Sequence, residues 1–296
     1  MMARFLQVAF VLLAVVAAAV GVSIGWRWGA AVGVAAFVLS FFALQIAIPV
    51  LAYALAFRDR TPEDVRVGLS GSFRAMVEEL FSFWLIFVVR QPLEHLWRGG
   101  AEGAAAPGET PILLIPGYCC NRAMWGALER RLRAAGRTVA SVTLDPPFGG
   151  IDELAEALGK EIDRLLARTG AQKVALVGHS MGGLIARAYL ARRGPEKVAS
   201  LVTIGAPHHG SRLARLGPGR DAREMEPDSP WLAELNRHAP TVPTHCVWSA
   251  GDEFVVPRDS ARLEGARETT LATPGHFGLL RAPEVFRAVL EASAHR

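Results

Sequence analysis

The sequence predicts an α/β domain with a mostly parallel sheet flanked by helices, preceded by a hairpin of two apolar helices. From Pro111 onward, short apolar runs alternate with amphipathic segments, which is typical of parallel sheets covered by helices on both faces. Residues 1–57 carry only two charged side chains, Arg4 and Arg27, as membrane segments do. Between these two parts, residues 99–109 are rich in Gly, Ala and Pro, which indicates a linker.

The composition excludes several classes of protein. The chain has 296 residues, of which 51% are hydrophobic and 20% charged, so it can form a large core and is not a disordered chain. Three cysteines are too few to hold together a disulfide scaffold of this length. The net charge is +4 at pH 7 and no segment forms a basic block, so we expect no nucleic-acid partner.

Residues 1–57 are expected to form a membrane anchor of two transmembrane helices. The first uncharged run, residues 5–24, would span about 30 Å as a helix, which is the thickness of the hydrocarbon layer of a bilayer. The second, residues 29–57, is long enough to span the membrane with a tilt or with a kink at Pro49. Two tryptophans around Arg27 join the runs and suit an interfacial turn.

A cleavable signal peptide is the alternative for the first run, with a cleavage site at residues 17–19. That run is long for a signal peptide, and cleavage would still leave the second run as an anchor. Arg4 lies before the hairpin, and Arg58 and Arg60 follow it, whereas the turn holds only Arg27. The positive-inside rule therefore predicts a multi-pass inner-membrane protein with its downstream domain on the cytoplasmic side.

Residues 58–109 are expected to form a juxtamembrane helix followed by the linker. The apolar run Leu80 to Val89 is too short to span a membrane, and extending it would bury Glu78 and Glu79 at about 2.5–3.5 kcal/mol each. A helix over residues 72–97 is therefore predicted to lie on the membrane surface or against the soluble domain. A buried helix of the globular domain is the alternative.

Residues 110–296 contain the elements of the predicted sheet. Strands are expected where short aliphatic and β-branched runs occur, and helices where apolar residues recur every three or four positions, as in residues 151–168. The expected strands are residues 111–115, 138–144, 173–177, 198–204, 242–248 and 268–272, and the expected helices are 125–135, 151–168, 182–193 and 283–292.

A Gly-x-Ser-x-Gly motif, residues 178–182, lies between an expected strand and an expected helix. Ser180 must occupy a strained turn where neighbouring backbone leaves no room for side chains at Gly178 and Gly182. The N-terminus of the following helix favours negative charge that develops beside the serine. The motif therefore predicts Ser180 as a nucleophile, and a purely structural turn is the alternative.

A serine hydroxyl needs a base, and the base needs a carboxylate that orients it. His276 lies in a loop between the last strand and the last helix, and Asp252 directly follows a strand, so both are expected at the edge of the sheet that carries Ser180. The alternatives for the acid are Asp145 and Glu253; among the other histidines, His208 and His209 follow a strand, His179 is expected beneath the nucleophile, and His245 lies inside a strand.

Two backbone N–H groups should stabilise the negative charge that develops in such a reaction. One is expected from Met181, the residue after the nucleophile, and the other from Tyr118, because Gly117 lets the loop after the first strand approach closely. The neighbouring Cys119 and Cys120 offer a redox or metal site as an alternative. No other cysteine or histidine has the spacing of a metal site, so we expect neither metal nor cofactor.

From Pro111 to its end, the sequence resembles the α/β-hydrolase superfamily and, within it, bacterial triacylglycerol lipases and esterases. The resemblance implies an α/β-hydrolase fold with Ser180 as nucleophile, Asp252 as acid and His276 as base, in the chain order of that family, and with Tyr118 and Met181 as oxyanion donors. Many lipases have His-Gly where this chain has Pro116-Gly117. The motifs that carry the resemblance are PGYCCNRAMW at 116–125, GHSMGG at 178–183, GAPHHGS at 205–211, and SAGDEFVVP at 249–257 with PGH at 274–276.

The resemblance also implies a cover over the active site. Residues 206–240 form a long insertion between two strands and are interpreted as an amphipathic lid, with a plain surface excursion as the alternative. The predicted function is a membrane-anchored serine hydrolase that cleaves carboxylic esters, with acyl lipids as substrates and the lipid bilayer as partner. An acyltransferase or thioesterase with the same residues, and a non-catalytic membrane-bound scaffold on this fold, are the alternatives.

Overall fold

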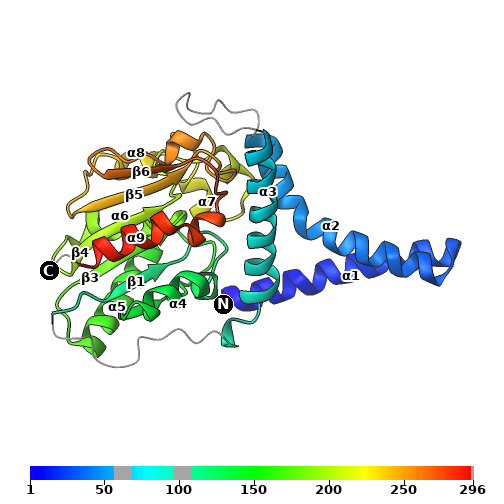
Figure 1. Ribbon diagram of the computed structural model, residues 1–296, viewed down its shortest axis with the longest axis horizontal. Coiled ribbons are helices and arrows are strands. Elements are labelled where there is room, and N and C mark those ends of the chain that lie inside the picture. Colours follow the sequence, from blue (N-terminus) through cyan, green and yellow to red (C-terminus); the bar gives the residue numbers. More distant parts are fainter. Residues whose placement is uncertain (57–68, 97–107, 295–296) are drawn as a thin grey trace.

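A computed structural model describes residues 1–56, 69–96 and 108–294 of the chain. It consists of a globular α/β part and a long helical hairpin that projects from one side of it (Figure 1). A third helix lies between the two, across the base of the hairpin (Figure 1). The predicted linker falls outside the described residues up to position 107, as do Arg58 and Arg60.

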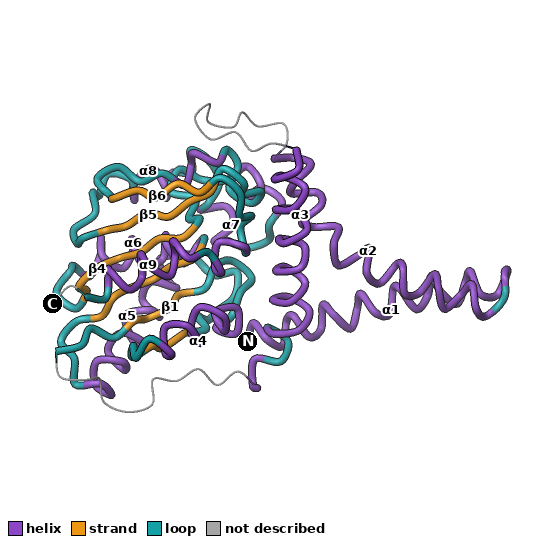
Figure 2. Tube along the Cα trace, viewed as in Figure 1, coloured by secondary structure: helices purple, strands orange, loops and turns teal. Residues whose placement is uncertain are grey.

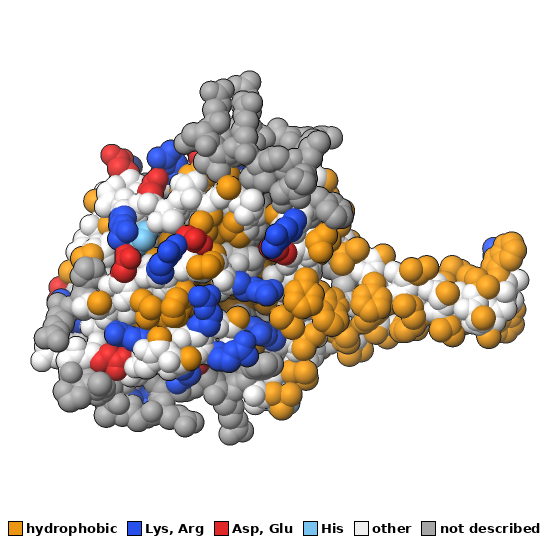
Figure 3. Space-filling model, in the orientation of Figure 1, with side chains coloured by type: hydrophobic (Ala, Val, Ile, Leu, Met, Phe, Trp, Pro, Cys, Tyr) orange, Lys and Arg blue, Asp and Glu red, His pale blue; other side chains and the backbone are white. Residues whose placement is uncertain are grey.

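The hairpin consists of helices α1 (Met2–Trp28) and α2 (Ala30–Ala56), each 27 residues long. Both are long and apolar enough to cross a membrane, and only 11% of the most apolar stretch of each is buried, unlike a core helix. Its surface is hydrophobic along almost its whole length (Figure 3). The two helices touch through glycines, because a Cβ atom at Gly33 would lie 2.7 Å from the Gly21 carbonyl oxygen.

Helix α3 (Leu69–Trp84) continues as a π-helical segment, η1 (Leu85–Arg90), and ends in a short 3₁₀ turn, η2 (Glu94–Leu96). The single helix predicted over residues 72–97 is thus divided, since Pro92 has no N–H to continue it. Glu79 is buried on the side facing the globular part, whereas Phe81 is exposed. The segment therefore packs against the α/β part, one of the placements predicted for it.

Within the described residues, six parallel strands form one sheet in the order β2-β1-β3-β4-β5-β6. Figure 2 shows the strands in orange, with helices around them. The predicted parallel sheet is confirmed. The strand expected over residues 138–144 pairs over only three residues, because its one neighbour, β1, already ends at Ile115. The strands are β1 (Ile112–Ile115), β2 (Val139–Ser141), β3 (Val174–His179), β4 (Val198–Ile204), β5 (Thr244–Ser249) and β6 (Arg267–Leu271).

Helices cover both faces of the sheet because successive strand residues point to opposite sides. Leu113 and Ile115 pack with α5 and α6 on one face, and Ile112 and Leu114 pack with α4 and α9 on the other. The longer helices are α4 (Gly126–Ala134), α5 (Ile151–Thr169), α6 (Met181–Arg193) and α9 (Pro283–Ala292); the short ones are η3 (Arg122–Trp125), η4 (Arg212–Leu216), α7 (Arg220–Glu224), α8 (Pro230–Leu235), η5 (Arg258–Ala261) and η6 (Gly278–Arg281).

The core on the α5 side yields a stability prediction. Leu158 of α5 is fully buried in it, so Leu158→Ala should lower the free energy of unfolding by about 2–5 kcal/mol. Arg168→Ala, on the exposed side of the same helix, should change it by less than about 0.5 kcal/mol. Urea unfolding of the detergent-solubilised full chain measures both, and equal effects of the two substitutions would contradict this packing.

Candidate active site

Ser180 lies at a strained turn between β3 and α6. Its backbone has φ 53° and ψ −127°, a conformation that residues with a side chain rarely adopt. A Cβ atom at Gly178 would lie 2.4 Å from the backbone of Gly182, and one at Gly182 would lie 2.3 Å from the Ile115 carbonyl oxygen. The two glycines of the motif are therefore required by the crowding that the sequence predicted.

Asp252 and His276 meet at the same end of the sheet. The Nδ1 atom of His276 lies 2.8 Å from Oδ2 of Asp252, and both side chains are buried. A carboxylate can only accept, so Nδ1 carries the proton and Nε2 is the ring nitrogen that can act as a base. The other oxygen of Asp252 accepts from the backbone N–H groups of Phe254 and Val255, which fixes the carboxylate.

Ser180 is linked to this pair through its neighbours. The backbone N–H of Ser180 donates to the carbonyl of Ile204 at 2.8 Å. The next residue, Gly205, faces the pair, since a Cβ atom there would lie 3.0 Å from Oδ2 of Asp252. In addition, the ring of His179, the neighbour of Ser180, lies 4.5 Å from the ring of His276 between centroids. Residues from the ends of β3, β4 and β5 and the loop after β6 thus converge at one place.

The alternative acids and bases lie elsewhere or have other partners. Asp145 is exposed beyond β2, and Oε2 of Glu253 faces the backbone N–H of His276 rather than its ring. His208 is buried with its two ring nitrogens next to Arg187 and Thr203, and burial lowers its pKa well below the ordinary value. Asp252 and His276 are therefore the acid–base pair that the geometry favours.

The loop after β1 approaches Ser180 closely. A Cβ atom at Gly117 would lie 2.9 Å from the Cβ of Ser180, so only glycine allows this approach. Met181 is the first residue of α6, so its N–H has no acceptor within the helix and can face a ligand. The hydroxyl of Tyr118 donates to the carbonyl of Pro218 at 2.5 Å, which ties this loop to the insertion after β4.

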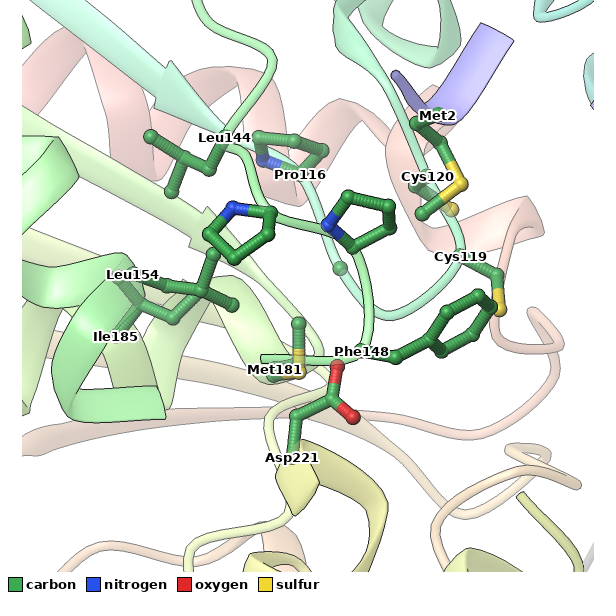
Figure 4. A pocket seen from close by; sticks show the side chains of 13 residues that line it. Met2, Pro116, Cys119, Cys120, Leu144, Phe148, Leu154, Met181, Ile185 and Asp221 are labelled. Carbon is green, nitrogen blue, oxygen red and sulfur yellow. The ribbon is translucent and has the colours of Figure 1, made fainter. Parts of the chain in front are cut away.

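A small cavity, partly open to solvent, borders Gly117 and Met181 (Figure 4). Most of its lining is apolar, including Leu154 and Ile185 from the core. Met2, from the first turn of α1, lines it on the side of Cys120 (Figure 4). The base of the hairpin is therefore part of the wall of the cavity, which the sequence did not reveal.

The cysteine pair near the cavity does not have the properties of a reactive or metal-binding site. Burial raises the pKa of Cys119 to about 12, so its thiol is protonated at neutral pH, and burial also raises the pKa of Cys120 well above its ordinary value. Among the described residues, no group of three or more His, Cys, Asp or Glu side chains could hold a metal ion.

Glu79 is a further residue that sequence reasoning missed. It is fully buried, and its carboxylate accepts from the backbone N–H groups of Phe277 and Gly278 at 2.8 and 2.7 Å, directly after His276. Its neighbour Glu78 is exposed and pairs with Arg74. Nothing in the sequence separates the two glutamates, because the contact joins positions almost 200 residues apart.

Comparisons with known proteins agree with this architecture. The family model described as "alpha/beta hydrolase fold" matches residues 110–226. A triacylglycerol lipase of Pseudarthrobacter phenanthrenivorans is 40% identical over 112 residues, which are 35% of this chain and 35% of the lipase. A triacylglycerol lipase of Pseudomonas fragi is 37% identical over 152 residues, 46% of this chain and 51% of the lipase. The chain thus spans only about a third to a half of the length of these relatives.

Solved structures share the fold at low sequence identity. The mature Bacillus licheniformis lipase BlEst2 superposes with a TM-score of 0.57 at 18% identity, covering 65% of this chain and 94% of that protein. Aspergillus fumigatus lipase B superposes with a TM-score of 0.59 at 21% identity, covering 67% of this chain and 56% of that protein. The chain therefore has the α/β-hydrolase fold and resembles the triacylglycerol lipases and esterases of the α/β-hydrolase superfamily.

Proposed function

We propose that the chain is a serine hydrolase that cleaves carboxylic esters through an acyl-enzyme on Ser180. The observation that carries this proposal is the convergence of a serine in a strained strand-to-helix turn with a buried Asp252–His276 hydrogen bond of 2.8 Å. A nucleophile, a base and an orienting acid at one edge of a sheet are the parts that acyl transfer requires. The lipase relatives support the same reaction class.

In the acylation step, Oγ of Ser180 attacks the ester carbonyl carbon while Nε2 of His276 takes the hydroxyl proton. Asp252 holds the ring in the required tautomer and stabilises its positive charge. The oxyanion that forms accepts from the backbone N–H groups of Met181 and Tyr118. When the tetrahedral intermediate collapses, the carbon–oxygen bond of the ester breaks, and the alcohol leaves with the proton from His276.

Deacylation repeats these steps with water. His276 removes a proton from water, the hydroxide oxygen attacks the acyl carbon, and the bond to Ser180 breaks as the proton returns to the serine. The carboxylic acid is then released. An alcohol or a thiol in place of water would give acyl transfer on the same residues, so the acceptor decides between hydrolase and transferase.

We propose acyl lipids as the substrates. The cavity beside Gly117 and Met181 is small, and most of the side chains that line it are apolar, as the surface that contacts an acyl chain would be. Met2 of the hairpin forms part of its wall, and Phe5 of the hairpin contacts Phe148 at the rim with ring centroids 5.0 Å apart. A hairpin embedded in a membrane would hold the mouth of this cavity at the lipid surface.

We propose that α1 and α2 anchor the protein in the inner membrane, with the hydrolase domain, residues 110–296, on the cytoplasmic side. Length, hydropathy and low burial of the two helices support the anchor. Both ends of the hairpin lie at the globular part, so Arg27 at its far end would be on the opposite side of the membrane (Figure 1). The exposed Phe81 of α3 would then lie near the interface.

The insertion after β4 is proposed as the cover of the site. Asp221 lines the cavity, and the carbonyl of Pro218 holds Tyr118. Farther along, Met225, Leu232 and Leu235 are buried in the core, so the rest of the insertion is firmly packed. We therefore propose the lid at residues 212–220, which contain no buried residue.

Ser180→Ala should abolish catalysis, because it removes the attacking oxygen. We expect hydrolysis of p-nitrophenyl acyl esters to fall by at least about 10³-fold, and labelling by a fluorophosphonate probe to disappear. Ser40→Ala is a matched control, since that hydroxyl donates to the carbonyl of Phe37 within α2.

Retention of full activity by Ser180→Ala would refute the mechanism. A folded wild-type chain inert to the probe would instead favour the non-catalytic scaffold. Product analysis with an added alcohol or thiol separates hydrolysis from transfer, because a transferase would form the new ester or thioester faster than the free acid.

The orientation can be tested with a reporter fused after Arg296. We expect a cytoplasmic reporter to be active and a periplasmic phosphatase to be inactive at this position, because the positive charges lie at the two ends of the hairpin. Phosphatase activity of the fusion would reverse the proposed orientation. Extraction of the chain from membranes by carbonate alone would show that the hairpin does not span the bilayer.

A further inference from the structure

Two buried carboxyl groups hold the backbone of the loop that carries His276. Glu79 accepts from the N–H groups of Phe277 and Gly278, and Oε2 of Glu253 lies 3.3 Å from the N–H of His276. Three consecutive backbone donors thus face two carboxyl groups. Because the ring of His276 can only be placed as accurately as its backbone, these bonds help to set the position of its Nε2 atom.

Glu79 reaches this loop from outside the α/β sheet. It belongs to α3, and its side chain enters the globular part next to Gly275, where a Cβ atom would lie 2.6 Å from its Oε2. Both Glu79 and Glu253 have no exposed surface. The loop therefore has room for this carboxylate only because residue 275 is glycine.

The surroundings of the pair hold more negative than positive charge. Asp252 adjoins Glu253 in the chain, the phenol of Tyr53 from α2 faces Glu253, and His276 interacts with Glu79 from the other side. Two ionised carboxylates side by side in such a buried place would repel each other strongly.

A single proton resolves this conflict. Glu253 has a buried Oε1 that makes no hydrogen bond among the described residues, although the phenol of Tyr53 faces this carboxyl group, and a negative charge there would be costly. Protonated, it can donate to Glu79, which keeps the charge that its two backbone donors stabilise. Burial and the charges of Glu79 and Asp252 raise the pKa of Glu253 well above its ordinary value, consistent with this assignment.

We propose that Glu79 is a positioning residue for the loop of His276, and that it acts as the ionised half of a carboxyl pair whose proton resides on Glu253. Helix α3 would then be part of the catalytic apparatus, although it lies outside the hydrolase domain. This inference rests on the proposed role of His276 as the catalytic base. The proton on Glu253, by contrast, can be observed whether or not the chain has activity.

The test uses the full chain in detergent micelles, with Glu79→Gln, Glu253→Gln and, as a matched control, Glu78→Gln. Steady-state hydrolysis of a p-nitrophenyl ester across pH gives kcat, KM and the shape of the pH profile. Infrared difference spectra between wild type and Glu253→Gln, recorded near neutral pH, report the carbonyl stretch of a protonated carboxyl group.

We expect Glu253→Gln to keep kcat within about threefold, since a neutral amide can donate to Glu79 as the protonated carboxyl does. Glu79→Gln should lower kcat by about 10- to 100-fold with little change in KM, because one backbone donor then faces an amide NH₂ and the loop shifts. Loss of the negative charge should also move the acid limb of the pH profile to lower pH, and Glu78→Gln should change nothing.

The outcomes separate this inference from the proposed function. A wild-type chain without activity but with the protonated-carboxyl band would refute the function and retain the pair. An active wild type without that band, or one in which Glu253→Gln lowers kcat as much as Glu79→Gln, would overturn the assignment of the proton. Full activity and an unchanged pH profile in Glu79→Gln would overturn the positioning role.

Discussion

The site depends on one steric constraint, the crowding of three backbone segments around Ser180. The turn from β3 into α6 passes so close to itself and to the end of β1 that no Cβ atom fits at Gly178 or Gly182. This crowded turn holds the serine in a positive-φ conformation that it would rarely adopt in an unconstrained chain. The strain is tolerated because a fully buried strand and a largely buried helix hold the turn on both sides.

The parallel sheet extends this constraint to the other functional groups. All six strands point the same way, so each loop that follows a strand lies at the same edge. Gly205 after β4, Asp252 after β5 and His276 after β6 thereby lie at the edge of the sheet that carries Ser180. Even the hydrogen bond from Ser180 to Ile204 is a continuation of the pairing between β3 and β4.

Features that depend on local pattern were predictable from the sequence. Strand β4 and helix α9 have the predicted bounds, because β-branched runs and helical periodicity identify such elements directly. The elbow glycines, and Asp252 beside His276, followed from motif and chain order. The length of β2 was wrong, since pairing at a sheet edge depends on what lies next to it rather than on its own composition.

Contacts between distant segments were not predictable. The sequence of α1 does not indicate that Met2 lines the cavity. A membrane-spanning helix would account for all of its apolar residues, so none of them stands out. The division of the third helix at residues 85–90 likewise has no local signature beyond Pro92. Such features arise from packing between distant segments, and the hydrophobic pattern of each segment is already explained by its own secondary structure.

The place of α3 and of Met2 bears on how separable the two halves of this protein are. By composition, the chain looks like a soluble enzyme attached to a removable anchor. Its structure is less modular, because Met2 of the hairpin lines the cavity and Glu79 of α3 supplies the acceptors for two backbone donors of the loop that carries His276. A fragment that begins at the linker would keep the sheet and its strained serine but would open the cavity and leave those donors without Glu79. The linker at residues 99–109 therefore separates two regions of the sequence but does not separate the hydrolase domain from all the residues that complete its site.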